Sequence, residues 1–122
     1  MAPANEPKIL LRHGTTRRRA ENIIKNGPDP HFLEPGGLDE AVGLSVTPIS
    51  GPYPQGSAEK YAVGKARVFP TEGGPAIVEI EVPVSVAARA VNVGGEIRFL
   101  PGYGLEELLS VWVTLPKRIV SL

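Results

Sequence analysis

Glycine and proline interrupt this chain so often that its helices and strands have to be short. The chain contains 14 glycines and 13 prolines among its 122 residues. Proline ends helices and central strands, and glycine favours turns and helix ends. The longest apolar runs fall far below the ~18 residues of a membrane-spanning helix. We therefore expect one small, loop-rich domain over residues 8–122, preceded by a flexible lead over residues 1–7.

The spacing of apolar residues predicts short strands and helices between the glycines and prolines. Apolar runs predict strands at 8–12, 42–47, 76–82, 96–100, 110–114 and 118–121. Helical spacing predicts helices at 17–26 and 58–65 and a helical turn at 105–109. We expect a turn at 13–16 and loops at 28–41 and 48–56. Thr16 and Ser57 are the expected N-caps of the two helices, and Gly27 followed by Pro28 ends the first.

The order of these elements favours an α+β fold. A strand–helix–strand–helix half is followed by a half made mostly of strands, which differs from the regular alternation of a doubly wound parallel sheet. Within 76–82, Val78, Ile80 and Val82 alternate with Glu79 and Glu81. The apolar side chains are therefore expected in the core, and the two glutamates on a solvated strand face.

Charge and composition exclude several classes of chemistry. The 13 lysines and arginines are balanced by 13 aspartates and glutamates, so the basic excess typical of proteins that bind phosphate backbones is missing. The chain has no cysteine, which excludes disulfides, zinc ribbons and thiol catalysis. Residues 1–7 contain neither the basic region nor the apolar run of a signal peptide, so we expect a cytoplasmic protein.

The chain has two histidines, His13 and His31, and only one is a strong candidate for binding a ligand. His31 lies in a proline-rich segment and is expected at the surface. His13 follows an apolar strand and precedes Gly14, where the missing side chain lets a ligand approach the backbone. His13 therefore either caps the end of a strand or contacts a ligand.

The run Arg12-His13-Gly14 resembles the opening of the histidine phosphatase and phosphoglycerate mutase group, in which the histidine accepts a phosphate. That chemistry needs a second catalytic histidine, further phosphate-binding arginines and a much larger domain. His31 is too near in sequence to serve, so this resemblance is set aside.

A second resemblance extends over most of the chain. The run His13-Gly14-Thr15 is similar to the opening of ADP-ribosyltransferases, and 44–47 with 57–62 is similar to their second block, a strand ending in Thr followed by a helix bearing Tyr-Ala. Residues 76–83 resemble their central strand, and 110–119 their last hairpin. The chain thus resembles a small stand-alone bacterial member of the His-Tyr-Glu branch, which includes diphtheria-toxin-like and poly-ADP-ribose-polymerase-like enzymes.

The resemblance implies a split core of two small, mostly antiparallel sheets with NAD in the cleft between them. His13 would bond the ribose that carries adenine, the backbone of Gly14 would hold the nicotinamide carboxamide, and Tyr61 would stack on the nicotinamide ring. The further NAD-binding residues that it implies are Arg12, Thr15, Thr47 and Ser57. No metal is required, because a fixed carboxylate stabilises the positive charge that develops on the ribose.

That carboxylate is expected from a late glutamate, at or just before the penultimate strand. Because 110–114 is predicted to be this strand, Glu107 is the first candidate and Glu106 the second. Glu96, which opens the predicted strand 96–100, is the third. The glycines of 102–104 give the mobility expected of a loop that contacts substrate.

The implied activity is transfer of ADP-ribose from NAD to a protein or nucleic-acid acceptor, or hydrolysis of NAD. Such a protein can act as a toxin delivered into the cytoplasm of a target cell, with an immunity protein as partner, and no membrane is involved. One alternative is a non-catalytic module that binds NAD or ADP-ribose on the same scaffold. A weaker alternative is an RNA 2′-phosphotransferase-like activity, which needs more histidine and arginine ligands than two histidines readily supply.

Two further features carry expectations of their own. Arg17-Arg18-Arg19 opens the first helix, where positive charge opposes the helix dipole. We expect a solvated face there, with contact to a phosphate or a target as the alternative. Trp112 is expected in the core, because it alternates with Val111 and Val113.

Overall fold

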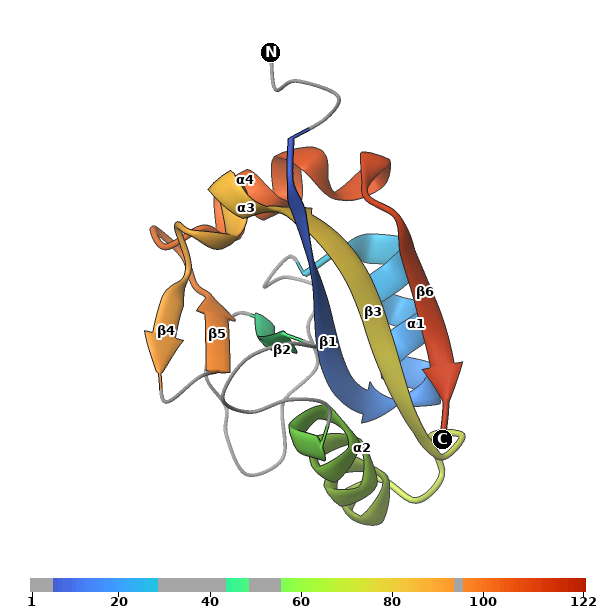
Figure 1. Ribbon diagram of the computed structural model, residues 1–122. Helices are drawn as coiled ribbons and strands as arrows, with labels where there is room; N and C mark the ends of the chain where they lie inside the picture. Colours follow the sequence, from blue (N-terminus) through green and yellow to red (C-terminus); the bar gives the residue numbers. More distant parts are fainter. Residues whose placement is uncertain (1–5, 29–43, 49–55, 94–95) are drawn as a thin grey trace.

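The computed structural model describes residues 6–28, 44–48, 56–93 and 96–122, and it shows an α+β fold (Figure 1). The elements in chain order are β1 (Lys8–Thr16), α1 (Arg17–Asn26), β2 (Leu44–Pro48), α2 (Gly56–Val68), β3 (Pro75–Pro83), α3 (Val84–Ala87), β4 (Val91–Val93), β5 (Glu96–Phe99), α4 (Leu105–Val111), a 3₁₀ helix η1 (Trp112–Thr114) and β6 (Lys117–Ser121). The predicted bounds of α1 are confirmed. Thr16 caps its start by accepting the backbone N–H of Arg19, and Gly27 ends it with φ of 78°.

The strands follow the order β4-β5-β2-β1-β3-β6, and every neighbouring pair is antiparallel. They form two small sheets that meet at β2. β1 pairs with β3 along its whole length, but among the described residues it pairs with β2 only where Leu11 faces Pro48 and Arg12 faces Thr47. The earlier residues of β2 pair instead with β5. The expectation of two small antiparallel sheets is therefore confirmed, and the two sheets separate directly after Arg12.

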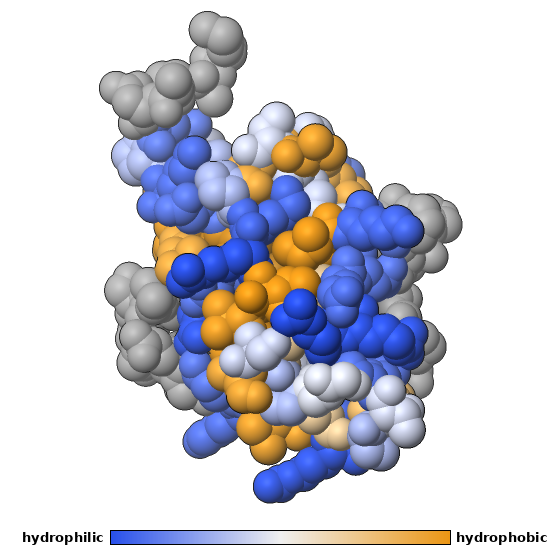
Figure 2. All heavy atoms as spheres, turned by 90° about the vertical axis from the view of Figure 1, so that its right-hand side faces the viewer, coloured by the Kyte–Doolittle hydropathy of each residue, from blue (hydrophilic) through white to orange (hydrophobic). Residues whose placement is uncertain are grey.

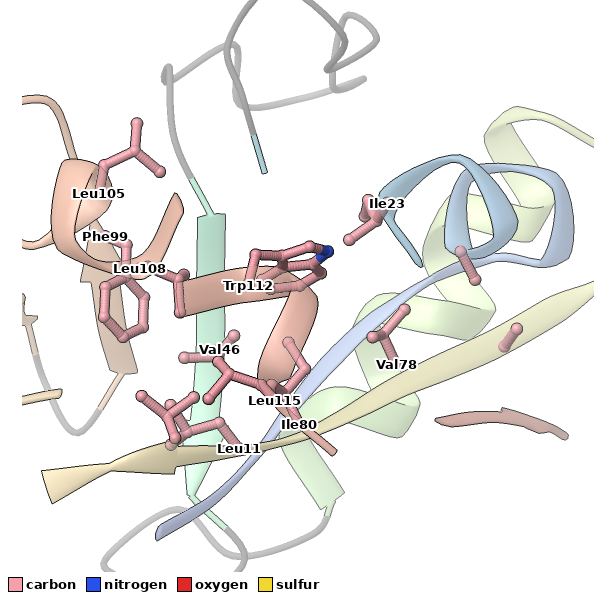
Figure 3. Close-up of a cluster of buried hydrophobic side chains, with 13 residues drawn as sticks. Leu11, Ile23, Val46, Val78, Ile80, Phe99, Leu105, Leu108, Trp112 and Leu115 are labelled. Carbon is pink, nitrogen blue, oxygen red and sulfur yellow. The ribbon is translucent and has the colours of Figure 1, made fainter. Parts of the chain in front are cut away.

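The main core lies between the sheets, α1 and α4. The largest buried side chains come from β1, β2, β3, β5 and α4, and Figure 3 shows Trp112 in the middle of the cluster. Indole Nε1 of Trp112 donates to the carbonyl of Ile24 over 3.4 Å, which joins η1 to α1. Because this side of β3 presents Val78 and Ile80, the prediction that they face the core is confirmed.

Helix α2 covers the opposite face of β1 and β3. Ala58 and Ala62 pack there against Ile77, which neighbours the core residue Val78 in β3 and so points to the other side of the sheet. The sheet is therefore covered on both faces where α2 lies, at the lower end of the molecule in Figure 1.

The strand β6 forms one edge of the larger sheet. Figure 2 looks onto this side of the molecule, where hydrophobic residues form an irregular band among hydrophilic ones. Lys117 and Arg118 open the strand, and Arg118 is exposed. Charged side chains of this kind are typical of edge strands that do not pair with another chain.

The predicted strand at 110–114 is wrong, because these residues continue α4 and form η1. Leu105, Leu108 and Trp112 are spaced three and four residues apart, and all three are buried. That spacing places them on one helical face, so burial of Trp112 is confirmed although its predicted element is not.

Other differences concern the ends of elements. The predicted turn at 13–16 is the second half of β1, since β3 supplies a ladder partner for each of its residues. Ser57 lies inside the first turn of α2, which begins at Gly56, and is not its cap. The short elements α3 and β4 were not predicted. His31 and most of the two predicted loops lie outside the described residues.

Candidate functional site

The point where the two sheets separate lies at His13. β2 leaves β1 after Arg12, so over the segment 13–16 the ladder of β1 runs with β3 alone among the described strands. His13 is opposite Val78 in this ladder and is half-buried. Directly opposed residues share a face, so His13 points to the side of the sheet that carries the main core.

Gly14 is the point of closest approach between β1 and α2. A Cβ atom built on Gly14 would lie 1.9 Å from the carbonyl oxygen of Ala58 and 2.8 Å from the backbone nitrogen of Ala62. Only glycine fits between strand and helix at this distance. Tyr61 belongs to the same turn of α2, and its side chain is 54% exposed.

The structure therefore brings some of the predicted NAD-binding residues together and separates others. Gly14 meets the helix that carries Tyr61, whereas His13 faces the other side of the sheet. Thr15 is buried on the same face as His13. Thr47 is paired with Arg12, and Ser57 precedes Ala58 in α2, so their backbones flank this region.

Arg12 is buried and forms ion pairs with two carboxylates. Its Nη1 donates to Oε1 of Glu59 in α2 over 2.6 Å, and its Nε donates to Oε2 of Glu79 in β3 over 3.1 Å. The other oxygen of Glu79 accepts from Nε of Arg118 over 2.6 Å. We call Glu59, Arg12, Glu79 and Arg118 the charge network.

The prediction that Glu79 lies on a solvated strand face is wrong, because its residue is only 6% exposed. Arg12 stands opposite it in β1, and Arg118 opposite it in β6. Two arginines from neighbouring strands thus cover and neutralise the carboxylate. Glu81 is exposed, as predicted.

Glu106 and Glu107 lie far from α2. They belong to α4, at the upper end of the molecule in Figure 1, whereas α2 lies at the lower end. Glu106 Oε1 accepts the backbone N–H of Gly102 over 2.9 Å, and Glu107 Oε1 lies 3.6 Å from Nη2 of Arg89. The position of α4 therefore places both carboxylates at the end of the molecule remote from α2.

Glu96 occupies a different position. Because 110–114 is helical, the penultimate strand is β5, and Glu96 is its first residue. The next residue, Ile97, pairs with Val46, which precedes Thr47 in β2. Thr47 in turn pairs with Arg12. The backbone of Glu96 is therefore placed across β2 from the part of β1 where the sheets separate.

A second cluster of charges surrounds Glu72 in the turn before β3. Its carboxylate accepts from Thr16 Oγ1 over 2.8 Å, from Arg19 Nε over 2.7 Å and from Arg18 Nη2. The hydrogen bond from Arg19 is the largest cause that lowers the pKa of Glu72 from 4.5 to about 2, and burial opposes it. Arg17 and Arg18 line an open pocket of about 320 Å³ beside this cluster.

This cluster shows that the expectation of a solvated face is wrong for Arg19, whereas Arg17 and Arg18 are exposed as predicted. Arg19 is buried, with its guanidinium 3.9 Å from the centre of the Phe69 ring. Sequence reasoning missed Glu72. The available signal was three arginines where the helix dipole disfavours positive charge, which indicates an anionic partner from elsewhere in the chain.

Comparisons with protein-family models, with curated proteins and with solved structures gave no match. Across the described ranges, no group of three or more histidine, cysteine, aspartate or glutamate side chains is arranged to hold a metal ion. No helix in the described part of the chain is long and apolar enough to cross a membrane.

Proposed function

We propose that this protein is an ADP-ribosyltransferase-like enzyme that cleaves the bond between nicotinamide and ribose in NAD and transfers ADP-ribose to a macromolecule or to water. The observation that carries the proposal is the separation of β1 from β2 directly after Arg12. It leaves His13 and Gly14 at the start of the strand segment that β2 does not pair, next to the helix that carries Tyr61.

In the proposed complex, the two ends of NAD contact opposite faces of the sheet at β1. The exposed ring of Tyr61 offers the aromatic surface for nicotinamide on the α2 side, whereas Ala58 and Ala62 of α2 fill the space next to Gly14 that the resemblance gives to the carboxamide. His13 faces the other side and would bond the ribose that carries adenine. A ligand that reaches both faces has to pass around the edge of a strand, and an extended dinucleotide is long enough to do so.

Glu96 is the carboxylate that we assign to the nicotinamide ribose, in place of Glu107. The family resemblance puts this group at the penultimate strand, which is β5, and Glu96 opens it. Glu106 and Glu107 are held at the other end of the molecule from α2. A carboxylate fixed beside the ribose stabilises the positive charge that develops as nicotinamide leaves.

Release of nicotinamide from NAD tests the proposal. We expect His13→Ala to abolish release and Glu96→Gln to lower its rate by roughly 10²–10³, the scale of removing one transition-state stabiliser. Glu107→Gln and Glu106→Gln are the matched controls and should stay near the wild-type rate. A large loss of rate in Glu107→Gln with no loss in Glu96→Gln would show that the catalytic carboxylate lies in α4 and not in β5. Mass spectrometry of a lysate incubated with the protein and NAD would identify the acceptor.

The second candidate function is a non-catalytic module that binds NAD or ADP-ribose. The placement of Glu106 and Glu107 in α4, remote from α2, favours it, because two of the three candidate carboxylates thereby lie away from Tyr61. It predicts calorimetric binding of NAD with no nicotinamide release above background. Turnover that disappears in His13→Ala eliminates it.

A further inference from the structure

The charge network links the larger sheet to α2 at the position of the proposed site. Arg118, Glu79 and Arg12 come from the neighbouring strands β6, β3 and β1, where ladder pairing fixes their spacing. Glu59 comes from α2. The ion pair between Arg12 and Glu59 is therefore the contact through which this network reaches from the sheet to the helix.

We propose that Arg12 is a positioning residue, which acts through Glu59 to fix α2, and with it Tyr61, against the strand that carries His13. The inference rests on the proposed function, because it concerns the geometry of the same site. It gives Arg12 a different role from the NAD contact that the family resemblance implies.

Two contacts in register support this role. Arg12 bonds Glu59, and Gly14 packs against Ala58, the preceding residue of α2. His13 lies between the two anchored residues of β1. One contact alone would allow the helix to pivot, but two neighbouring contacts fix both its position along the strand and its rotation.

Tyr61 is close enough to these contacts to depend on them. It follows Glu59 by two residues, which is about 3 Å along the axis at the ~1.5 Å rise of an α-helix. Its ring is exposed, so packing restrains the ring itself only in part. The position of its backbone is set by contacts of α2 on both sides of it: Glu59 and Ala58 meet β1 before it, and Ala62 packs against the sheet directly after it.

The electrostatics of Glu59 make Arg12 necessary. Glu59 Oε2 is buried and accepts no hydrogen bond from the described residues, and Oε1 bonds to Arg12. Loss of Arg12 would leave the part-buried carboxylate of Glu59 without its ion-pair partner, whereas loss of Glu59 would leave Arg12 paired with Glu79 but no longer linked to α2. Lysine cannot replace Arg12, since its single nitrogen lacks the fork that reaches both Glu59 and Glu79.

The test uses ¹⁹F NMR to detect a change in the surroundings of Tyr61, and it does not depend on enzymatic activity. The protein is produced with 3-fluorotyrosine, and the ¹⁹F resonances of its three tyrosines are assigned with single Tyr→Phe variants. We expect Glu59→Ala to shift or broaden the Tyr61 resonance and to leave that of Tyr103, outside α2, in place. Glu59→Gln keeps an acceptor for Arg12 and should retain the wild-type resonance. Lys60→Ala, an exposed neighbour on α2, is the matched control.

Kinetics with NAD supply the second readout. If Tyr61 holds nicotinamide equally in the ground and transition states, its displacement in Glu59→Ala should raise KM about tenfold while kcat changes less than about threefold. Arg12→Lys should reproduce both effects, because it also breaks the link to α2.

Two results would overturn the inference. One is an unmoved Tyr61 resonance in folded Glu59→Ala. The other is a raised KM in Arg12→Lys with Tyr61 unmoved, which would make Arg12 a direct substrate contact. Absence of NAD turnover in the wild-type protein would refute the proposed function and leave the ¹⁹F comparison to decide the role of Arg12.

Discussion

Replacing Glu72 with Gln should destabilise the protein in a way that depends on pH. Glu72 is buried, and its carboxylate accepts hydrogen bonds from Thr16, Arg18 and Arg19. These contacts join the start of α1 to the turn before β3. Gln keeps the shape of the side chain but removes the charge, so the change isolates the electrostatic part of the cluster.

The expected magnitude follows from the pKa of Glu72, which is lowered from 4.5 to about 2 in the folded protein. At about 1.36 kcal/mol per unit, the full shift corresponds to roughly 3 kcal/mol. Arg18 is half-exposed, and solvent weakens its share, so we expect about 2 kcal/mol at pH 7. Because the folded pKa lies below the unfolded one, this stability is present above about pH 5 and is lost as pH falls toward 2.

Urea unfolding between pH 7 and pH 3 provides the assay. The difference in unfolding free energy between wild type and Glu72→Gln should be near 2 kcal/mol at pH 7, and more than half of it should vanish by pH 3. Glu81→Gln, on an exposed position of β3, is the control and should change stability by less than about 0.5 kcal/mol at either pH. A difference for Glu72→Gln that is constant with pH would refute the electrostatic argument.

Three further changes test the packing. Thr16→Ala removes the N-cap of α1 and also the hydrogen bond from Thr16 to Glu72, so it should cost at least about 1 kcal/mol in urea unfolding; no measurable change would show that neither contact contributes. Leu108→Ala empties a fully buried site and should cost about 2–5 kcal/mol in the same measurement, so a loss below 1 kcal/mol would contradict its place in the core. Gly14→Ala should lower the melting temperature, because the new methyl group would collide with the carbonyl of Ala58 in α2. Gly64→Ala, at a position of α2 with open space around it, should raise the free energy of unfolding by about 0.5–1 kcal/mol. Equal effects of the two glycine changes would argue against the close approach.

Local signals predicted the parts of the fold that depend on neighbouring residues. The bounds of α1 follow from Thr16 at one end and from Gly27 and Pro28 at the other, all of which act within one turn. The α+β class follows from the order of elements. The second half of β1 was missed because Gly14 is a weak strand former and lies close to the start of a helix, which is typical of a turn; pairing with a strand about 60 residues later holds the segment extended.

The segment 110–114 shows how two periodicities compete. Alternation of Val111, Trp112 and Val113 indicates a strand, and the spacing of Leu108 from Trp112 indicates a helix. The helix buries Trp112 against α1, where its indole donates to the carbonyl of Ile24. Ile24 lies far away in the sequence, so a short window around Trp112 does not reveal this contact. This one assignment also changed which glutamate the family resemblance selects.

The candidate site was predictable only in part for the same reason. Residue types near His13 suggested a ligand, but the burial of Glu79 depends on Arg12, 67 residues earlier in the chain. The link between Arg12 and Glu59 spans 47 residues. Pairs at such separations leave no periodic signal in one sequence, because each partner alone resembles an ordinary surface charge.

Because the ladder between β1 and β2 is short, we expect the smaller sheet to unfold locally more easily than the larger sheet. Among the described residues, two pairs join these strands, whereas β1 and β3 share nine. The smaller sheet is otherwise held by side chains such as Val46 and Phe99, which enter the common core. We therefore expect its backbone amides to exchange with solvent deuterium through a local opening that leaves β1, β3 and β6 protected, so that the two sheets behave as separate cooperative units.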